Sequence, residues 1–260
     1  MTYLAYRNLW QNKLRLFLSV GGVALAMMLI ILLSGFLSGI NEQVTAYLDN
    51  TPADLIIAQD GVTNLLGATS LLPAGATDQA LGVRGVAQVM PIISQFVIFD
   101  LHEKKVVAYM VGYDAKQGGG PWGMKSGRLP DDDDEVVLDW VMAEEHGLKV
   151  GETLDILDDE FTIVGLSDGT NSWMASFFFV TRQAAERLLL TPGRTSFVLL
   201  ALDADADAEE VEARLRRRMR NMEILPASTI KQNDLDVFVK VFAAPLQMMV
   251  TISFAVGTAI

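Results

Sequence analysis

Side chains that could perform chemistry are few in this 260-residue chain. It has no cysteine, which excludes a disulfide framework and thiol catalysis. The two histidines, His102 and His146, are isolated and lack the spacing of a zinc site. Because both histidines are isolated, the serine, threonine and aspartate residues do not form a recognisable catalytic set of nucleophile, base and orienting group. The sequence therefore predicts a non-catalytic chain with no cofactor-binding or metal-binding residues.

Three acidic or glycine-rich runs resemble ligand-binding loops but do not match the residue patterns that define such loops. In "DADADAEE" at 203–210, the sixth and twelfth positions of a calcium loop would be Ala208 and Arg214 instead of Gly and Glu. "DDDDE" at 131–135 could hold a hard cation, although a solvated loop is the favoured interpretation. "GGGP" at 118–121 lacks the Lys-Ser/Thr pair of a phosphate-binding loop. We expect the first run to cap a helix instead.

The charge distribution is uneven along the chain. A net charge of −12 argues against nucleic acid as a partner, because phosphates call for a basic face. Residues 1–40 contain Arg7, Lys13 and Arg15 and no acidic residue, so the remainder carries −15, from 17 basic and 32 acidic residues. Apolar residues make up 51% of the chain and concentrate at its two ends. The ends are therefore candidates for membrane segments.

Residues 16–48 begin with an apolar run that is long enough to cross a membrane. Leu16 to Leu33 is already 18 residues without a charge, and the run continues to Ile40. A helix of that length exceeds the roughly 30 Å hydrocarbon core, whereas the core of a signal peptide has only ~7–15 residues. We therefore expect a retained first transmembrane helix with an extension to residue 48. The basic flank predicts that the N-terminus is cytoplasmic.

The residues on either side of this run also carry information. Residues 1–15 are predicted to form an amphipathic helix in the cytoplasmic interface, with aromatic residues at headgroup level. It is either a simple anchor or a surface for a cytoplasmic partner, with Arg7, Trp10, Lys13 and Arg15 as the interface candidates. Within the run, a GxxxG pattern could let a second helix approach closely. The helix-packing candidates are Ser34, Gly35, Ser38 and Gly39.

A second uncharged run follows Lys240 and continues to Ile260. Residues 236–260 are accordingly expected to form a second transmembrane helix. One span out and one back would place the intervening domain on the far side of the membrane. The sequence stops inside this run with no polar residue after it, which favours a truncated membrane part.

Residues 49–235 have the alternating patterns of an α+β domain. Strands are expected at 53–59, 86–101, 104–114, 136–139, 152–157, 160–167, 176–180, 196–203 and 221–227, and helices near 77–81, 140–147, 181–190 and 207–220. The last of these helices is predicted in most detail. Asp207 should cap it, and Val211, Leu215 and Met219 should form its buried stripe. Glu210 should pair with Arg214 and Glu212 with Arg216.

One stretch points to a known family. The pattern "GR-P…EVVLD…A…GLKVGETL…FTIVGL" between residues 127 and 166 follows "AYRNLWQNKLRLFLSVGGVALA" and "ADLIIAQ" in order. This series resembles the permease subunits of the MacB, LolC/LolE, DevC and FtsX group of ABC transporters, over nearly the whole chain. The resemblance implies an extracytoplasmic, two-lobed α+β core domain flanked by transmembrane α-helices. One lobe would comprise about 50–115 and 195–230, and the inserted β-rich lobe about 116–194.

The resemblance also implies a mechanical function. A cytoplasmic ABC ATPase subunit would hydrolyse ATP, and a second permease copy or paralogue would complete a dimer. The chain would lie in the cytoplasmic membrane, in contact with the lipid bilayer, and the resemblance also allows an extracytoplasmic adaptor as a partner. It would couple ATP hydrolysis to movements of the outer domain for export or extraction of a substrate.

Two other functions stay open at this point. The chain could regulate extracytoplasmic cell-wall hydrolases, as FtsX-like proteins do, although those have a smaller outer domain without the inserted lobe. It could also be a two-span anchored sensor or interaction module that works without an ATPase.

Overall fold

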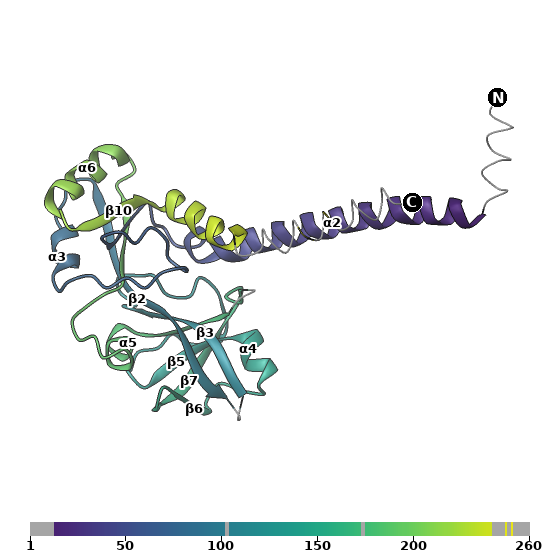
Figure 1. Ribbon diagram of the computed structural model, residues 1–260. Coiled ribbons are helices and arrows are strands. Elements are labelled where there is room, and N and C mark those ends of the chain that lie inside the picture. Colours follow the sequence, from purple (N-terminus) through teal and green to yellow (C-terminus); the bar gives the residue numbers. More distant parts are fainter. Residues whose placement is uncertain (1–12, 102–103, 173–174, 241–247, 249–250, 252–260) are drawn as a thin grey trace. The chain divides into compact units, whose positions relative to one another are not determined.

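The computed structural model describes residues 13–101, 104–172, 175–240, 248 and 251 (Figure 1). It divides into two units, residues 1–42 with 236–260, and residues 43–235, which we call the core domain. Arg7, Trp10 and most of the second apolar run lie outside the described residues.

The first helix, α2 (Lys13–Asp49), runs unbroken for 37 residues. Within the described residues, no helix meets the combined length and hydropathy requirements of a membrane-spanning segment. Helix α2 nevertheless exposes many large apolar side chains, among them Phe17, Val20, Val23, Leu25, Met27, Met28, Ile31 and Leu32. Exposed apolar side chains of this kind call for a covering partner or an apolar solvent.

The core domain begins with an antiparallel sheet of four strands. Its order is β10 (Met222–Pro226), β1 (Leu55–Gln59), β9 (Phe197–Leu202) and the first half of β2 (Val86–Leu101). Leu55 and Ile57 face a cluster that includes side chains of α3 (Ala76–Ala80) and α6 (Ala208–Arg218), which lie beside this sheet in Figure 1. Ile56 and Ala58 face a second cluster. Strand β1 is apolar from Leu55 to Ala58 because both of its faces are covered there.

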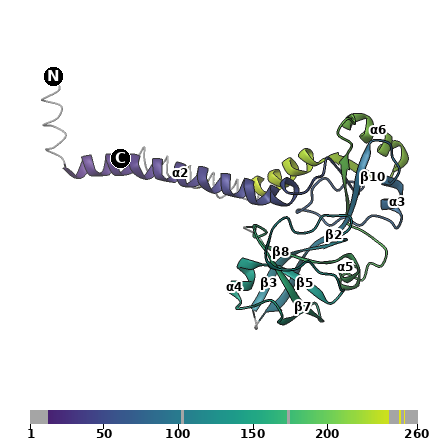
Figure 2. The same cartoon turned by 180° about the vertical axis from the view of Figure 1, so that it is seen from behind.

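A second, mixed sheet continues from the other half of β2. Its order is β2, β3 (Lys104–Tyr113), β8 (Ser176–Thr181), β5 (Glu135–Asp139), β7 (Asp159–Ser167) and β4 (Met124–Gly127), with β6 (Thr153–Ile156) paired to β7. The pairs β3–β8 and β5–β7 are parallel. Helices α4 (Trp140–Glu145) and α5 (Arg182–Leu188) accompany this sheet (Figure 2).

Strand β2 passes from the first sheet into the second. It pairs with β9 as far as Ile92 and with β3 from Ile93 onward, so the hairpin at 93–113 lies in the second sheet. The reason is that β9 starts at Phe197, opposite Ile92, and leaves the rest of β2 without that partner. Strand β4 lies in a segment expected to be a loop. Its polar, glycine-containing sequence and irregular register hide the strand pattern.

The predicted details of α6 are confirmed. The Asp207 carboxylate accepts hydrogen bonds from the backbone N–H groups of Glu209 and Glu210. Val211 and Leu215 are fully buried and Met219 nearly so. The ion pairs Glu210–Arg214 and Glu212–Arg216 both form. Local sequence determines this helix because its cap, stripe and pairs all lie within thirteen residues.

The motif that carries the family resemblance is a structural framework. Arg128 forms a bidentate ion pair with Glu135, whose carboxylate also accepts the N–H groups of Asp131 and Asp132. The Arg128 hydrogen bonds hold the pKa of Glu135 down at about 2. Asp139 caps α4 and accepts a 2.7 Å hydrogen bond from the Thr170 hydroxyl. The acidic run is therefore tied into the fold at Glu135 and is not a wholly solvated loop.

The run "GGGP" has a packing reason. A Cβ at Gly120 would lie 2.2 Å from the Tyr113 ring, and one at Gly119, where φ is +87°, would lie 2.8 Å from Ile92. Only glycine fits such close approaches, and only glycine readily adopts the positive φ found at Gly119. The run therefore packs against strands β2 and β3.

Candidate functional site

The helix-packing candidates Ser34, Gly35, Ser38 and Gly39 lie on α2 in the described chain, and Lys13 and Arg15 lie at its start. Gly35 is exposed, and among the described residues nothing lies within 4 Å of a Cβ built at Gly35 or Gly39. As far as the described residues go, a close partner therefore has room on this side of the helix. A role in helix packing stays a prediction.

The acidic runs do not gather into a metal site. Within the described residues, no group of three or more His, Asp and Glu side chains is placed to hold a metal ion. In the run at 131–135, Asp133 accepts a hydrogen bond from Thr181 and Glu135 is paired with Arg128. His146 is the C-cap of α4, as expected, with its Nδ1 2.9 Å from the Met142 carbonyl oxygen.

The structure instead brings together polar residues where two helices meet the core domain. These residues lie on the last turns of α2 and on a helix over residues 227–240. We call the set the stem junction, and it consists of Tyr47, Asp49, Lys231, Asn233 and Asp234.

Tyr47 fixes the end of α2 in the second core cluster. Its side chain is 1% exposed, and its hydroxyl donates a 2.7 Å hydrogen bond to the Gly119 carbonyl oxygen. Its ring stacks on Phe177 at 6.0 Å and meets Trp122 edge-on at the same distance. Burial raises the pKa of the Tyr47 phenol, so this hydroxyl stays protonated and remains a donor. The last turn of α2 is thus an integral part of the core.

An ion pair joins the two helices directly. Lys231 Nζ lies 2.6 Å from Asp49 Oδ1. Partial burial opposes ionisation of Asp49, but hydrogen bonds from Lys231 and Thr45 outweigh it and lower the pKa of this carboxyl. The side chains of Lys231 and Asp49 are 27% and 48% exposed. The pair therefore orients the two helices more than it stabilises the fold.

Asp234 holds a loop of the core domain. Its carboxylate is 2% exposed, and Oδ1 accepts hydrogen bonds from the N–H groups of Leu65 at 3.0 Å and Leu66 at 2.9 Å. The adjacent residue, Asn233, donates a 2.7 Å hydrogen bond to the Thr63 carbonyl oxygen. Burial raises the pKa of Asp234 to about 6, against the lowering effect of these backbone donors. Asn233 and Asp234 thus tie the first part of the helix at 227–240 to the loop at 63–66.

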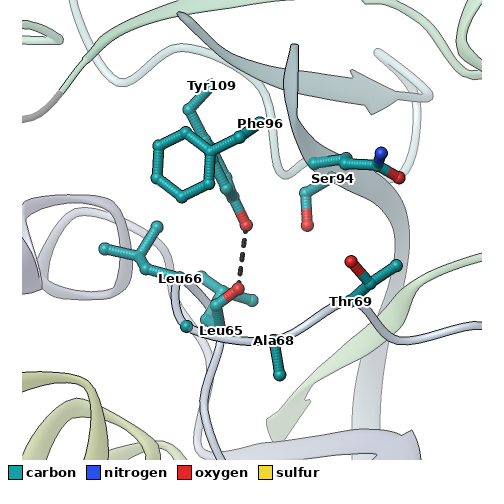
Figure 3. Close-up of a pocket in the computed structure, with 9 residues that line it drawn as sticks. Leu65, Leu66, Ala68, Thr69, Ser94, Phe96 and Tyr109 are labelled. Atoms are coloured by element: carbon teal, nitrogen blue, oxygen red, sulfur yellow. Dashed lines mark hydrogen bonds between the residues drawn. The ribbon is translucent and has the colours of Figure 1, made fainter. Parts of the chain in front are cut away.

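A pocket of about 180 Å³ lies beside this clamped loop (Figure 3). The hydroxyl of Tyr109 donates a 3.0 Å hydrogen bond across it to the Leu65 carbonyl oxygen. The Tyr109 ring packs edge-on against Phe96 at 4.8 Å. Burial raises the pKa of the Tyr109 phenol, and the Asp234 charge adds to this rise. Loop 65–69, strand β2 and strand β3 form the walls.

Sequence reasoning missed the stem junction. One signal could have found Asp234, because it lies between Ile230 and Phe238 at helical spacing, on a stripe whose other members are buried. An acid on an apolar stripe indicates a buried carboxylate with dedicated donors. No comparable local signal marks Leu65, Ser94 or Tyr109, whose meeting depends on the tertiary fold.

The raised pKa of Asp234 predicts a pH dependence of stability. Its carboxyl binds a proton more tightly in the folded protein, with a pKa of about 6, than in the unfolded chain, where the value is about 4. Its stabilising contribution is therefore complete below about pH 4 and is lost as the pH rises through about 6, by at most about 3 kcal/mol. Asp234→Asn should abolish this slope, since one amide oxygen can accept both N–H groups. Denaturant unfolding of the core domain between pH 4 and 7 measures it.

Asp158→Asn is the matched control for this experiment. Asp158 is an exposed turn residue with φ +74°, a conformation that asparagine tolerates. The control should keep the slope of the unaltered protein. A slope that persists in Asp234→Asn would assign the pH dependence to another group.

Comparison with solved structures shows which proteins share this fold. The periplasmic region of MacB from Actinobacillus actinomycetemcomitans matches with a TM-score of 0.52 and 16% identity, over 73% of this chain and 96% of that one. The extracellular domain of YknZ, described as a noncanonic ABC-type transporter from Gram-positive bacteria, matches with a TM-score of 0.51 and 13% identity, over 66% and 99%. At these identities the matches establish the fold alone. A search of curated proteins finds no match.

The family comparison goes further than the structural one. A family model described as a MacB-like periplasmic core domain matches residues 16–218, well over half of the chain. The fold and this match define a membrane protein of the ABC-transporter permease class. Within that class, the chain belongs to the MacB-like family, which confirms the resemblance in its sequence.

Proposed function

We propose that this chain is a permease subunit of the MacB, LolC/LolE and DevC type, which transmits the motion of a cytoplasmic ATPase to its extracytoplasmic core domain. Membership of the MacB-like family supports this proposal. The observation that carries it is the stem junction, where segments adjoining the two apolar runs are tied to each other and to the core domain. The chain itself catalyses nothing in this proposal, and a separate subunit hydrolyses ATP.

The proposed membrane segments are residues 16–48 and 236–260. The uncharged runs and the basic flank at Arg7, Lys13 and Arg15 support a cytoplasmic N-terminus. The exposed apolar side chains of α2 give it a surface that lipid or a second permease helix would cover. The bilayer and a second permease copy or paralogue are thus the proposed partners of this helix.

Within the core domain, buried contacts anchor the end of α2 and the start of the helix at 227–240. Tyr47 is buried among Phe177 and Trp122, and Asp234 binds two backbone N–H groups of one loop. A buried hydrogen-bonded carboxylate and a packed aromatic ring resist displacement more than exposed pairs do. A shift of either helix would consequently pull on the second core cluster and on loop 63–66. No substrate path through the bilayer is needed for this mechanism.

The proposed topology predicts one-sided labelling. Because the chain has no cysteine, Asp132→Cys provides a single thiol on an exposed residue, whose backbone N–H contact with Glu135 does not need the Asp132 side chain. In intact cells this thiol should react fully with a membrane-impermeant maleimide. Asn8→Cys should react only after lysis. Labelling of Asp132→Cys only in lysed cells would refute the extracytoplasmic position of the core domain.

Association with an ATPase separates this function from a two-span anchored sensor. The affinity-tagged chain, solubilised with native lipids, should retain an ATP-binding subunit that photoaffinity labelling with an ATP analogue detects. A regulator of cell-wall hydrolases would also bind such a subunit, but would stimulate peptidoglycan hydrolysis when reconstituted with the hydrolase. Recovery of the chain without any ATP-binding partner would count against the permease proposal.

A further inference from the structure

The pocket beside the stem junction contains a polar group with no partner. Ser94 is 2% exposed, and its Oγ makes no hydrogen bond in the described structure. Figure 3 shows this oxygen directed into the pocket, toward Thr69 and the Tyr109 hydroxyl. Buried hydroxyls are normally paired, and an unpaired one costs about 1–3 kcal/mol. A ligand or an ordered water is therefore expected to meet this hydroxyl.

The lining of the pocket restricts the kind of ligand. It contains no charged side chain and combines hydroxyl, amide and backbone groups with an aromatic ring; its residues are Leu65, Leu66, Gly67, Ala68, Thr69, Ser94, Gln95, Phe96 and Tyr109. A charged group would lose its hydration without gaining an ion pair, so an uncharged ligand is favoured. The pocket volume of about 180 Å³ is several times the volume that one water molecule occupies in the liquid. It is smaller than the ~300 Å³ of the smallest pockets that bind drug-sized ligands. The pocket therefore has room for one group of the size of a single sugar unit or amino-acid side chain.

We propose that this pocket binds a single neutral sugar unit. A sugar ring presents hydroxyls that can pair with Ser94, Thr69 and the Gln95 amide. Its polarised C–H groups suit the electron-rich face of Phe96. An amino-acid side chain of the same size would match either the polar or the apolar part of the lining, but seldom both.

Occupancy of the pocket would reach the stem junction. The wall of the pocket at Leu65 and Leu66 is the loop whose N–H groups Asp234 binds, and the Leu65 carbonyl oxygen accepts the Tyr109 hydroxyl. A ligand that rigidifies this loop must also restrain the helix at 227–240. The binding site itself does not depend on the proposed transport function, whereas this linkage rests on it.

The test uses the full chain in lipid nanodiscs, without sugar-headed detergents, which would compete for the pocket. Saturation-transfer NMR with N-acetylglucosamine and glucose as probes should show binding, with weaker signals for anionic glucuronate and cationic glucosamine. Hydrogen exchange of the amides at 63–70 should slow in the presence of the bound probe. Ser94→Ala, which deletes only the unpaired hydroxyl, should weaken binding about fivefold. Ser126→Ala, at an exposed residue outside the pocket, should leave binding unchanged.

A second variant changes an exposed residue and leaves the buried core unaltered. Ala68 is exposed on the rim, and Ala68→Trp should fill the entrance and abolish binding while the thermal melt stays unchanged. Absence of binding of both neutral sugars to the unaltered chain would overturn the proposal. So would equal binding of the charged sugars, unchanged affinity in both variants, or preferential binding of a short peptide such as triasparagine. None of these results depends on an ATPase, so the transport proposal is tested separately.

Discussion

Val211→Asp should leave the core domain, expressed as residues 43–235, unfolded at neutral pH. The Val211 side chain is fully buried between α6 and the first sheet, in a cluster that contains Leu55, Leu200 and Ile224. An aspartate there is a charge with no partner and also removes a well-packed apolar group. We expect a loss of more than about 4 kcal/mol, which is comparable to the total stability of many domains. Circular dichroism and a cooperative thermal melt measure the effect.

Arg217→Asp on the same helix is the matched control. Arg217 is exposed, so the same new side chain stays in water and changes only the interaction with the helix dipole, which is worth about 1 kcal/mol or less. This variant should melt cooperatively, within a few degrees of the unaltered domain. A folded and equally stable Val211→Asp variant would show that α6 does not contribute to the core.

If the chain transmits motion as proposed, double replacement of Gly35 and Gly39 by leucine should strongly reduce that transmission while the core domain stays folded. Both glycines lie on α2, and within the described chain nothing lies within 4 Å of a Cβ built at either one. If a second permease helix packs there, two leucines hold it away and remove most of the close contact. Crosslinking between permease copies and transport in proteoliposomes with the ATP-binding subunit should fall strongly. ATP hydrolysis should persist in an uncoupled form.

Replacement of Gly21 and Gly22 by leucine is the control for this experiment. These residues lie on the same helix and have equally open Cβ positions, but they lack the four-residue spacing. The control should retain transport and crosslinking, and the core domain should melt at the same temperature in both variants. Full transport by the Gly35/Gly39 variant would mean that this face meets lipid and that another surface carries the motion.

Much of the local structure follows from the sequence. The caps at Asp207 and Thr181, the ion pair of Glu210 with Arg214, and the position of His146 at a helix end are all short-range features. They were predictable because each depends on residues within about four positions along one helix. The family resemblance was also readable, since its pattern is a run of turn glycines and buried strands between residues 127 and 166.

The arrangement of the strands was less predictable. The parallel pairings β3–β8 and β5–β7 join segments with long intervening connections, and no turn residue specifies such partners. Strand β2 changes its partner at Ile92–Ile93 because β9 begins opposite Ile92, a fact that β2's own sequence does not contain. The sequence therefore predicts the hairpin at 93–113 but not the sheet in which it lies.

The sequence by itself determined the family, the apolar ends, the basic N-terminal flank and the absence of thiol chemistry, because composition and local spacing carry that information. Only the tertiary structure decided where buried polar groups meet. Asp234 and Leu65 are 169 residues apart, and Ser94 faces a loop that begins near residue 65. Hydrogen bonding in a buried site depends on distances of about 3 Å between groups that the chain brings together only when its core has packed.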